Sequence, residues 1–489
     1  MRFYYLLLPI KLDWFPVYKS QIPLRRGQRV EVTFSSKTYL AVVLGEAPAE
    51  EIASTVKVLE LENIPDNIAD ISEKELKLWT FVSEYYLCSL GEVYEAAYPK
   101  YKRTLSKRKK KNLQPSTVIS EEKRAESGKP ILYFSSDRVP YYLSKLNACI
   151  KQGFSALVLL SERELASIME EKLSSELDAP VLLYDSSLSP AARKKITESL
   201  GKAEEPLVLL GTRSAIFLPF RNLGLVIVDE EQDPYFKQTE PAPRYNGRDM
   251  AAVLSSIHGA QLILGSFAPS LESLYNCSIG KYEFLEGESA LNCKLEVVDI
   301  NAEKKKKGME GEYSKRLLSE ISRTKGQLMI IRSYSSEESV HEFFRERFPD
   351  LDPQILTAQA ARKATGHCAL MAILNGDSLF DSEDFRSDEK AFQLLRNLSL
   401  RCDKLFIQCS SSAHPVFSSL KKLDYEYRLL EERKVFKLPP YTRIVDIKDR
   451  KSGELVLREV FERDSKASEQ KSKLPLRYGA MYIIDVDPQ

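Results

Sequence analysis

The stretch "LGLVIVDEEQDPYFKQTE", residues 223–240, indicates the fold class of this chain. Its first six residues are apolar, which is typical of a strand buried on both faces of a parallel sheet. Three acidic residues, Asp229, Glu230 and Glu231, follow the strand directly. At the end of such a strand, one carboxylate can bind a magnesium ion and a second can position the water that attacks a phosphate. This chemistry also needs a glycine-rich loop with a lysine that binds the phosphates.

Short apolar runs alternate with helical patterns on both sides of this stretch. Further buried strands are predicted at 155–162, 206–212, 260–266, 326–334, 368–376 and 403–411. Residues 162–177 and 190–200 carry apolar positions at helical spacing. The alternation predicts an α/β fold with two parallel-sheet lobes, the first over 129–290 and the second over 291–435.

The flanking segments have a different composition. Residues 1–99 predict a small β domain that ends in helical structure over 73–97. From residue 100 to 111, eight of twelve residues are basic and none is acidic, so we interpret 100–128 as a basic linker. Residues 436–489 contain two strand patterns and predict a small α+β C-terminal domain.

Composition restricts the possible partners and cofactors. The chain has 489 residues, 71 basic and 70 acidic, so a basic surface must be local. Its seven cysteines include no C-x-x-C pair, so we expect reduced thiols, no structural zinc and a cytoplasmic location. The apolar run from Phe3 to Ile10 is shorter than the ~18–20 residues that a membrane span needs. We therefore expect no membrane association.

Several segments resemble, in order along the chain, one family of bacterial proteins. They are "EYYLCSLGEVYEAAYP" (84–99), "LLGTRSAIFLPFRNLGLVIVDEEQDPYFKQTEPAPRYNGRD" (209–249), "LGSFAPSLES" (264–273), "SEDFRSDEKAFQLL" (382–395), "AHPVF" (413–417), "LPPYTR" (438–443) and the ending "IDVDP". They resemble the primosomal protein N′ family, the PriA-type replication-restart helicases. The resemblance implies an N-terminal DNA-binding β domain, then two RecA-like lobes of the superfamily 2 helicase type, then a C-terminal domain. It also implies DNA as the partner, branched or single-stranded, together with other replication or primosome proteins.

The phosphate loop departs from the family pattern. The family reads T-[GS]-S-G-K-T-E-[IV]-Y, and the matching stretch here is "FSSDRVPYY", residues 134–142. The candidate nucleotide-binding residues are therefore Ser136, Asp137, Arg138 and Val139. Asp137 replaces the glycine, Arg138 the lysine and Val139 the magnesium-binding threonine. An aspartate brings negative charge where phosphates would bind, and valine has no hydroxyl for magnesium.

The differences between this loop and the family pattern also affect the interpretation of the other catalytic candidates. Because no stretch of the chain has the sequence G-K-[ST], we expect no ATP or magnesium and interpret Asp229 and Glu230 as vestigial. Arg401 matches the first arginine of the family's last helicase motif, and the second arginine is absent. The eight zinc-binding cysteines of the family are also missing from the second lobe.

The candidate DNA contacts come from charge and from the resemblance. Five consecutive cations, Lys107, Arg108, Lys109, Lys110 and Lys111, can neutralise phosphates and release counterions, although a solvated linker would have the same composition. Family positions that contact or line the DNA match Lys57, Thr212, Arg213, Arg244 and Arg248, although the stretches around the last four have an equally good structural explanation. The aromatic residue that stacks on a terminal base in the family is replaced by Pro16.

Three functions fit these observations. The first is an ATPase-inactive, fork-binding or scaffold factor in DNA replication restart. The second is an active ATP-dependent 3′–5′ DNA helicase with an atypical phosphate loop. The third is a protein–protein adaptor without nucleic-acid binding. DNA-stimulated phosphate release separates the first two, and salt-dependent binding to forked DNA separates both from the third.

Overall fold

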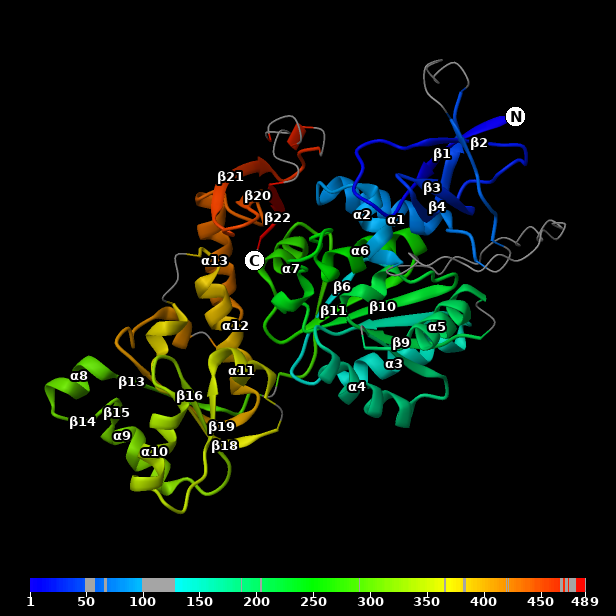
Figure 1. The fold of residues 1–489 in the computed structure, drawn as a ribbon. Coiled ribbons are helices and arrows are strands. Elements are labelled where there is room, and N and C mark those ends of the chain that lie inside the picture. Colours follow the sequence, from blue (N-terminus) through cyan, green and yellow to red (C-terminus); the bar gives the residue numbers. More distant parts are fainter. Residues whose placement is uncertain are drawn as a thin grey trace. The chain divides into compact units, whose positions relative to one another are not determined.

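The structure is a computed structural model whose elements are labelled in Figure 1. It describes residues 1–48, 58–65, 68–98, 128–185, 187–202, 205–289, 291–364, 366–380, 384–418, 420, 422–466, 469–470, 474 and 481–488. The backbone groups into two compact units. The first unit contains Met1–Ile131, Val139–Leu264 and Thr442–Gln489, and the second contains Leu132–Arg138 and Gly265–Tyr441.

The N-terminal domain is a five-stranded sheet with the order β3-β4-β1-β2-β5. Its strands are β1 (Arg2–Leu7), β2 (Val17–Ser20), β3 (Arg29–Phe34), β4 (Lys37–Glu46) and β5 (Leu59–Glu60). Alternate residues of β1, β3 and β4 point into one core that includes Leu6, Val32 and Val43. This period of two is the pattern of a sheet with one buried face, and it confirms the predicted N-terminal β domain.

The helical stretch predicted at 73–97 is two helices, α1 (Glu73–Tyr85) and α2 (Leu90–Ala97). Each begins with a capping box, formed by Ser72 and Glu75 in α1 and by Ser89 and Glu92 in α2. Between them Leu87 has a positive φ of 53°, which interrupts the helical backbone. Apolar spacing predicted the helices but not this break, because the spacing continues through it.

Gly91 of α2 lies against the backbone that follows β1. A Cβ atom at this position would overlap the carbonyl oxygen of Ile10 and lie 2.6 Å from that of Leu8. We expect Gly91→Ala to lower the free energy of unfolding by about 1–3 kcal/mol in urea titrations, because the clash outweighs the better helix propensity of alanine. Gly45→Ala, whose Cβ would meet nothing within 4 Å, is the control. Equal effects of the two substitutions would contradict the expectation.

The first lobe contains a seven-stranded sheet with the order β12-β6-β11-β10-β7-β9-β8. Its strands are β6 (Ile131–Phe134), β7 (Ser155–Leu159), β8 (Val181–Tyr184), β9 (Val208–Gly211), β10 (Leu223–Asp229), β11 (Gln261–Ser266) and β12 (Glu283–Glu286). The pairs β10–β7, β7–β9 and β9–β8 are parallel. The α-helices are α3 (Val139–Lys151), α4 (Arg163–Glu176), α5 (Pro190–Lys202), α6 (Gly247–His258) and α7 (Leu271–Ser278). Short 3₁₀ turns are η2 (Arg213–Phe217) and η3 (Pro234–Phe236).

The second lobe contains a five-stranded parallel sheet with the order β13-β19-β18-β16-β17. Its strands are β13 (Lys294–Asp299), β16 (Leu328–Arg332), β17 (Gln354–Thr357), β18 (Cys368–Ile373) and β19 (Cys402–Cys409). Its helices are α8 (Ile300–Lys305), α9 (Lys315–Arg323), α10 (Glu337–Arg347), α11 (Ala358–Lys363), α12 (Ser387–Ser399) and α13 (Asp424–Val435). A small hairpin, β14 (Met309–Glu310) and β15 (Tyr313–Ser314), and the 3₁₀ turns η4 (Gly376–Leu379) and η5 (Pro415–Ser418) complete it. One core cluster joins α9 and α10 to the strands.

The C-terminal strands form an antiparallel sheet with the order β21-β20-β22. They are β20 (Thr442–Asp449), β21 (Leu455–Glu462) and β22 (Tyr482–Val486), and they belong to the first unit. The sheets confirm the predicted α/β class with parallel lobes and an N-terminal β domain, whereas the domain boundaries at 99, 128, 290 and 435 stay predictions. Among the helices that the structure describes, none combines the length and apolar character required for a membrane span.

Candidate nucleotide loop and nucleic-acid interface

The degenerate phosphate loop connects a buried strand to a helix. Strand β6 ends at Phe134, residues 135–138 form the loop, and α3 begins at Val139. Ser136, Asp137 and Arg138 therefore lie in the loop itself. Strand, loop and helix follow one another as in a phosphate-binding loop, in which backbone N–H groups near the helix start bind phosphate oxygens.

Two backbone N–H groups of this loop donate to the protein itself. The amide of Ser135 donates to the carbonyl of Ser266 (3.1 Å), and the amide of Ser136 donates to the carbonyl of Glu288 (2.8 Å). The Ser136 hydroxyl also donates to the Glu288 carbonyl at 3.0 Å. The single proton of the Ser135 hydroxyl is shared between the carbonyls of Asp137 (2.7 Å) and Glu288 (3.0 Å). The Arg138 guanidinium donates to the Ser135 carbonyl at 3.1 Å. The loop is thus closed by hydrogen bonds to its own chain.

A magnesium–triphosphate does not fit the residues of this loop. The amides of Ser135 and Ser136 are already bonded to carbonyl oxygens, and Asp137 adds a carboxylate. The side chain of Val139, the first residue of α3, has no oxygen for a magnesium ion. Arg138 keeps a positive charge but uses its guanidinium to close the loop.

The acidic strand end of β10 is bonded within the first unit. Asp229, the last residue of the strand, accepts a hydrogen bond of 2.8 Å from the hydroxyl of Tyr142 in α3. Glu230 follows with a positive φ of 51° and accepts from the side-chain amide of Gln232. The buried Glu231 pairs with the equally buried Arg248 at 3.3 Å. Asp229 and Glu230 are therefore partly exposed, whereas Glu231 is buried. The ion pair of Glu231 with Arg248 stabilises the start of α6.

The other predicted arginines also have protein partners. Arg401, between α12 and β19, donates to the carbonyls of Asn397 and Ala364. Arg213, which follows Thr212 at the start of η2, donates to the carbonyl of Tyr235 at 2.8 Å.

Arg244 and Arg248 are buried in the segment that leads into α6. Arg244 pairs with Glu240 at 2.6 Å, and Arg248 also bonds Asp249 at 2.8 Å. A DNA role for these arginines and for Thr212 stays a prediction. The candidates Lys57, Lys107, Arg108, Lys109, Lys110 and Lys111 lie outside the described residues.

The N-terminal domain presents aromatic side chains beside the altered pocket residue. Pro16 is buried and accepts a hydrogen bond of 3.0 Å from the Leu6 amide. The preceding Trp14 and Phe15 are 56% and 41% exposed, and the Trp14 ring lies 6.2 Å from that of Phe34. Trp14 and Phe15 directly precede Pro16, where the family motif begins to match, so the motif does not identify them as site residues.

Arg396 in α12 is a further polar residue that motif reasoning missed. It is 0% exposed and lies 2.7 Å from the buried Glu426 of α13. Burial raises the pKa of the Glu426 carboxyl to about 7, even though the Arg396 guanidinium acts in the opposite direction. A signal existed in the sequence: Arg396 lies on the same helical face as Phe392 and Leu395, where an exposed charge is not expected.

Comparisons with known proteins agree with the motif order. The PriA family model described as the 3′DNA-binding domain (3′BD) matches residues 6–99. The Replication restart protein PriA of Rickettsia felis is 30% identical over 325 residues, which cover 62% of this chain and 49% of that protein. The Helicobacter pylori protein of the same name is 33% identical over 280 residues, which cover 55% of this chain and 44% of that protein.

The chain spans about half the length of the curated relatives it matches. A solved structure of RecG bound to a three-way DNA junction is 16% identical, with a TM-score of 0.37, over 65% of this chain and 43% of that one. The matched 3′BD domain, the relatives from two genera and the motifs along the chain agree with one another. The chain is thus similar to PriA proteins in these segments, and its loop has Asp137, Arg138 and Val139 where the family pattern has glycine, lysine and threonine.

Proposed function

We propose that this chain is a DNA-binding protein of replication restart that does not hydrolyse ATP and acts in the cytoplasm as a fork-binding or scaffold factor. The observation that carries the proposal is the closed loop at 135–138. Its first two amides donate to the carbonyls of Ser266 and Glu288, so a phosphate would have to displace bonds that the folded chain already makes. A ligand shifts such an equilibrium only by the difference in its affinity for the two states.

The DNA-binding part of the proposal rests on the N-terminal domain. Residues 6–99 match a family model described as a DNA-binding domain. The exposed rings of Trp14 and Phe15 offer faces on which unpaired bases can stack. Lys11 in the same loop and Lys37 after β3 are exposed and add positive charge at this end of the sheet. These features favour sequence-independent contact with single-stranded DNA.

One preparation can test both halves of the proposal. We expect fluorescence anisotropy to show binding to forked DNA that weakens steeply as salt rises, and phosphate release with saturating DNA to stay at the level without protein. Phosphate release that DNA stimulates would favour the active helicase instead. Absence of binding at low salt would favour the protein–protein adaptor.

A pair of substitutions tests where the DNA binds. We expect the double variant Trp14→Ala, Phe15→Ala to lose about 1–3 kcal/mol of binding free energy per stacked base. Tyr334→Ala, which removes an exposed aromatic ring from the second lobe, is the matched control and should leave the affinity unchanged. Equal affinities of the double variant and the unchanged protein would exclude these rings as the stacking surface.

A further inference from the structure

Arg396 connects two helices and a loop of the second lobe. Its Nε donates to the carbonyl of Leu420 (3.0 Å), its Nη1 to Glu426 (2.7 Å) and its Nη2 to the carbonyl of Lys422 (2.7 Å). An arginine presents these donors in one rigid plane, so the three bonds together hold the guanidinium in a single position.

The faces of the same guanidinium lie against three phenylalanine rings. The distances from its central carbon to the ring centroids are 5.4 Å for Phe134, 5.3 Å for Phe267 and 4.8 Å for Phe392. Phe134 and Phe267 also stack on each other, with their centroids 5.1 Å apart. Cation–π contacts of this kind are strongest where water is excluded, and all three rings are buried.

Two of these rings lie where strands of the first-lobe sheet end. Phe134 is the last residue of β6, directly before the loop at 135–138, and Phe267 follows the end of β11. Both fall in the same compact unit as Arg396. The family pattern has threonine at the position of Phe134, so the aromatic ring is a further departure of this chain.

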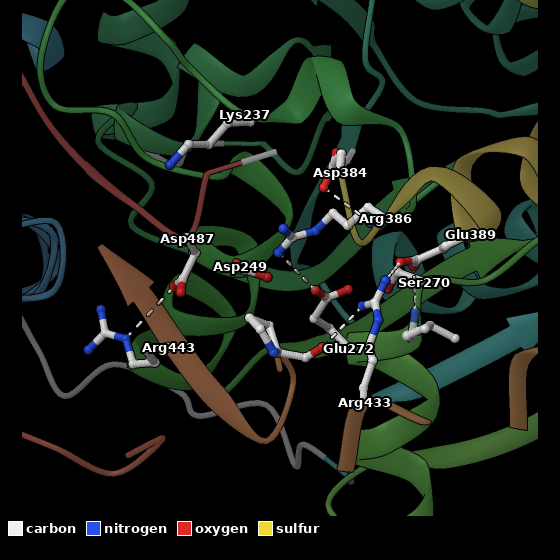
Figure 2. Close-up of polar contacts among 12 residues, drawn as sticks. Lys237, Asp249, Ser270, Glu272, Asp384, Arg386, Glu389, Arg433, Arg443 and Asp487 are labelled. Atoms are coloured by element: carbon white, nitrogen blue, oxygen red, sulfur yellow. Dashed lines mark hydrogen bonds and ion pairs between the residues drawn. The ribbon is translucent and has the colours of Figure 1, made fainter. Parts of the chain in front are cut away.

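A second set of bonds ties the start of α7 to the same helices. Glu389 of α12 accepts from the Leu271 amide (3.0 Å) and from Arg433 of α13 (2.5 Å). Figure 2 shows Arg433 facing Glu389, and Arg386 directed at Glu272, with the two charged groups 3.8 Å apart. Residues of α12 therefore contact Phe134, Phe267 and the start of α7.

We propose that Arg396, Phe134 and Phe267 form a permanent clamp that holds the segments 132–138 and 265–278 against α12 and α13 in the presence or absence of nucleotide. In enzymes that close on a nucleotide, ligand contacts supply the force for closure. In this chain the buried side chains of the clamp supply the force that ligand contacts supply there. The segments 132–138 and 265–278 therefore keep one position against α12 and α13. The inference goes beyond the proposed function, because the clamp acts whether or not the chain binds DNA.

Hydrogen exchange read by mass spectrometry on the full chain tests the clamp. In the unchanged protein, we expect peptides covering 132–138 and 265–278 to exchange slowly, with no change on addition of magnesium and a non-hydrolysable ATP analogue. Arg396→Lys keeps a charge but loses the planar donors and their stacking faces. We expect it to raise exchange in both segments by at least about tenfold, while β16 stays protected.

Two further variants complete the test. Arg316→Lys, at an exposed pair with Glu296 in the same unit, should leave both segments protected. Phe267→Leu removes one face of the clamp without touching a charge, and it replaces the lysine variant if that variant does not fold. The clamp is refuted if Arg396→Lys, or Phe267→Leu in its place, leaves both segments as protected as the unchanged protein. It is also refuted if the ATP analogue alone changes their exchange. Binding of forked DNA by the same variants, expected to be unchanged, reports separately on the proposed function.

Discussion

Replacing Glu389 by alanine is expected to lower the free energy of unfolding by about 3–5 kcal/mol. The buried Arg433 guanidinium lies 2.5 Å from Glu389 (Figure 2). The guanidinium also donates to the Pro439 carbonyl at 3.1 Å. Without the carboxylate, this positive charge stays in the interior with no ionic partner that the structure records among the described residues. The Leu271 amide, which donates to the same carboxylate, also loses its acceptor.

Chemical unfolding followed by circular dichroism measures this loss. Glu338→Ala, at an exposed position of α10, is the control and should change stability by no more than about 0.5 kcal/mol. Adding Arg433→Met to Glu389→Ala should recover part of the loss, because no unpaired charge then remains in the interior. A Glu389→Ala variant as stable as Glu338→Ala would show that the pair contributes nothing to the fold.

Lys237→Met is the second substitution for which we expect a loss of about 3–5 kcal/mol. The buried Lys237 ammonium lies 2.9 Å from Asp485 and donates to the carbonyls of Val486 (2.6 Å) and Arg244 (2.8 Å). Methionine preserves the length of the side chain but leaves the Asp485 carboxylate with Lys448, at 3.5 Å, as its nearest recorded cation. The C-terminal strand β22 should therefore lose its attachment to the segment between β10 and α6.

The measurement combines global unfolding with hydrogen exchange of a peptide covering 481–488. Lys19→Met removes a lysine from the more exposed pair with Glu60 and should cost less than about 1 kcal/mol. If both variants lost the same stability, or if exchange at 481–488 did not rise in Lys237→Met, the buried lysine would not anchor the C-terminal strand.

Local patterns predicted the buried strands of both lobes close to their observed bounds. The run "TRIVDIKD" is strand β20 (Thr442–Asp449) in full, and "LGLVIVD" is β10. Buried strands and amphipathic helices repeat at periods that a sequence displays directly, so their type can be assigned without the fold. The order of motifs also indicated the similarity to PriA proteins, because each motif is a short continuous segment. The break at Leu87 was missed, because a single residue with positive φ leaves the apolar spacing intact.

Sequence patterns are enough to assign the α/β class, the similarity to PriA proteins and the residues that depart from the phosphate-loop pattern. The groups that close that loop, and the charges that are buried together, depend on contacts between residues distant in the chain. Lys237 and Val486 are 249 residues apart in the chain, and nothing local to either predicts their bond. The bonds from Ser135 and Ser136 to the Glu288 carbonyl, and the rings of Phe134 and Phe267 against Arg396, depend in the same way on long-range packing. The strength of a buried polar contact depends on the exclusion of water by residues far away in the chain. The spacing of apolar residues along the sequence does not show which distant residues exclude it.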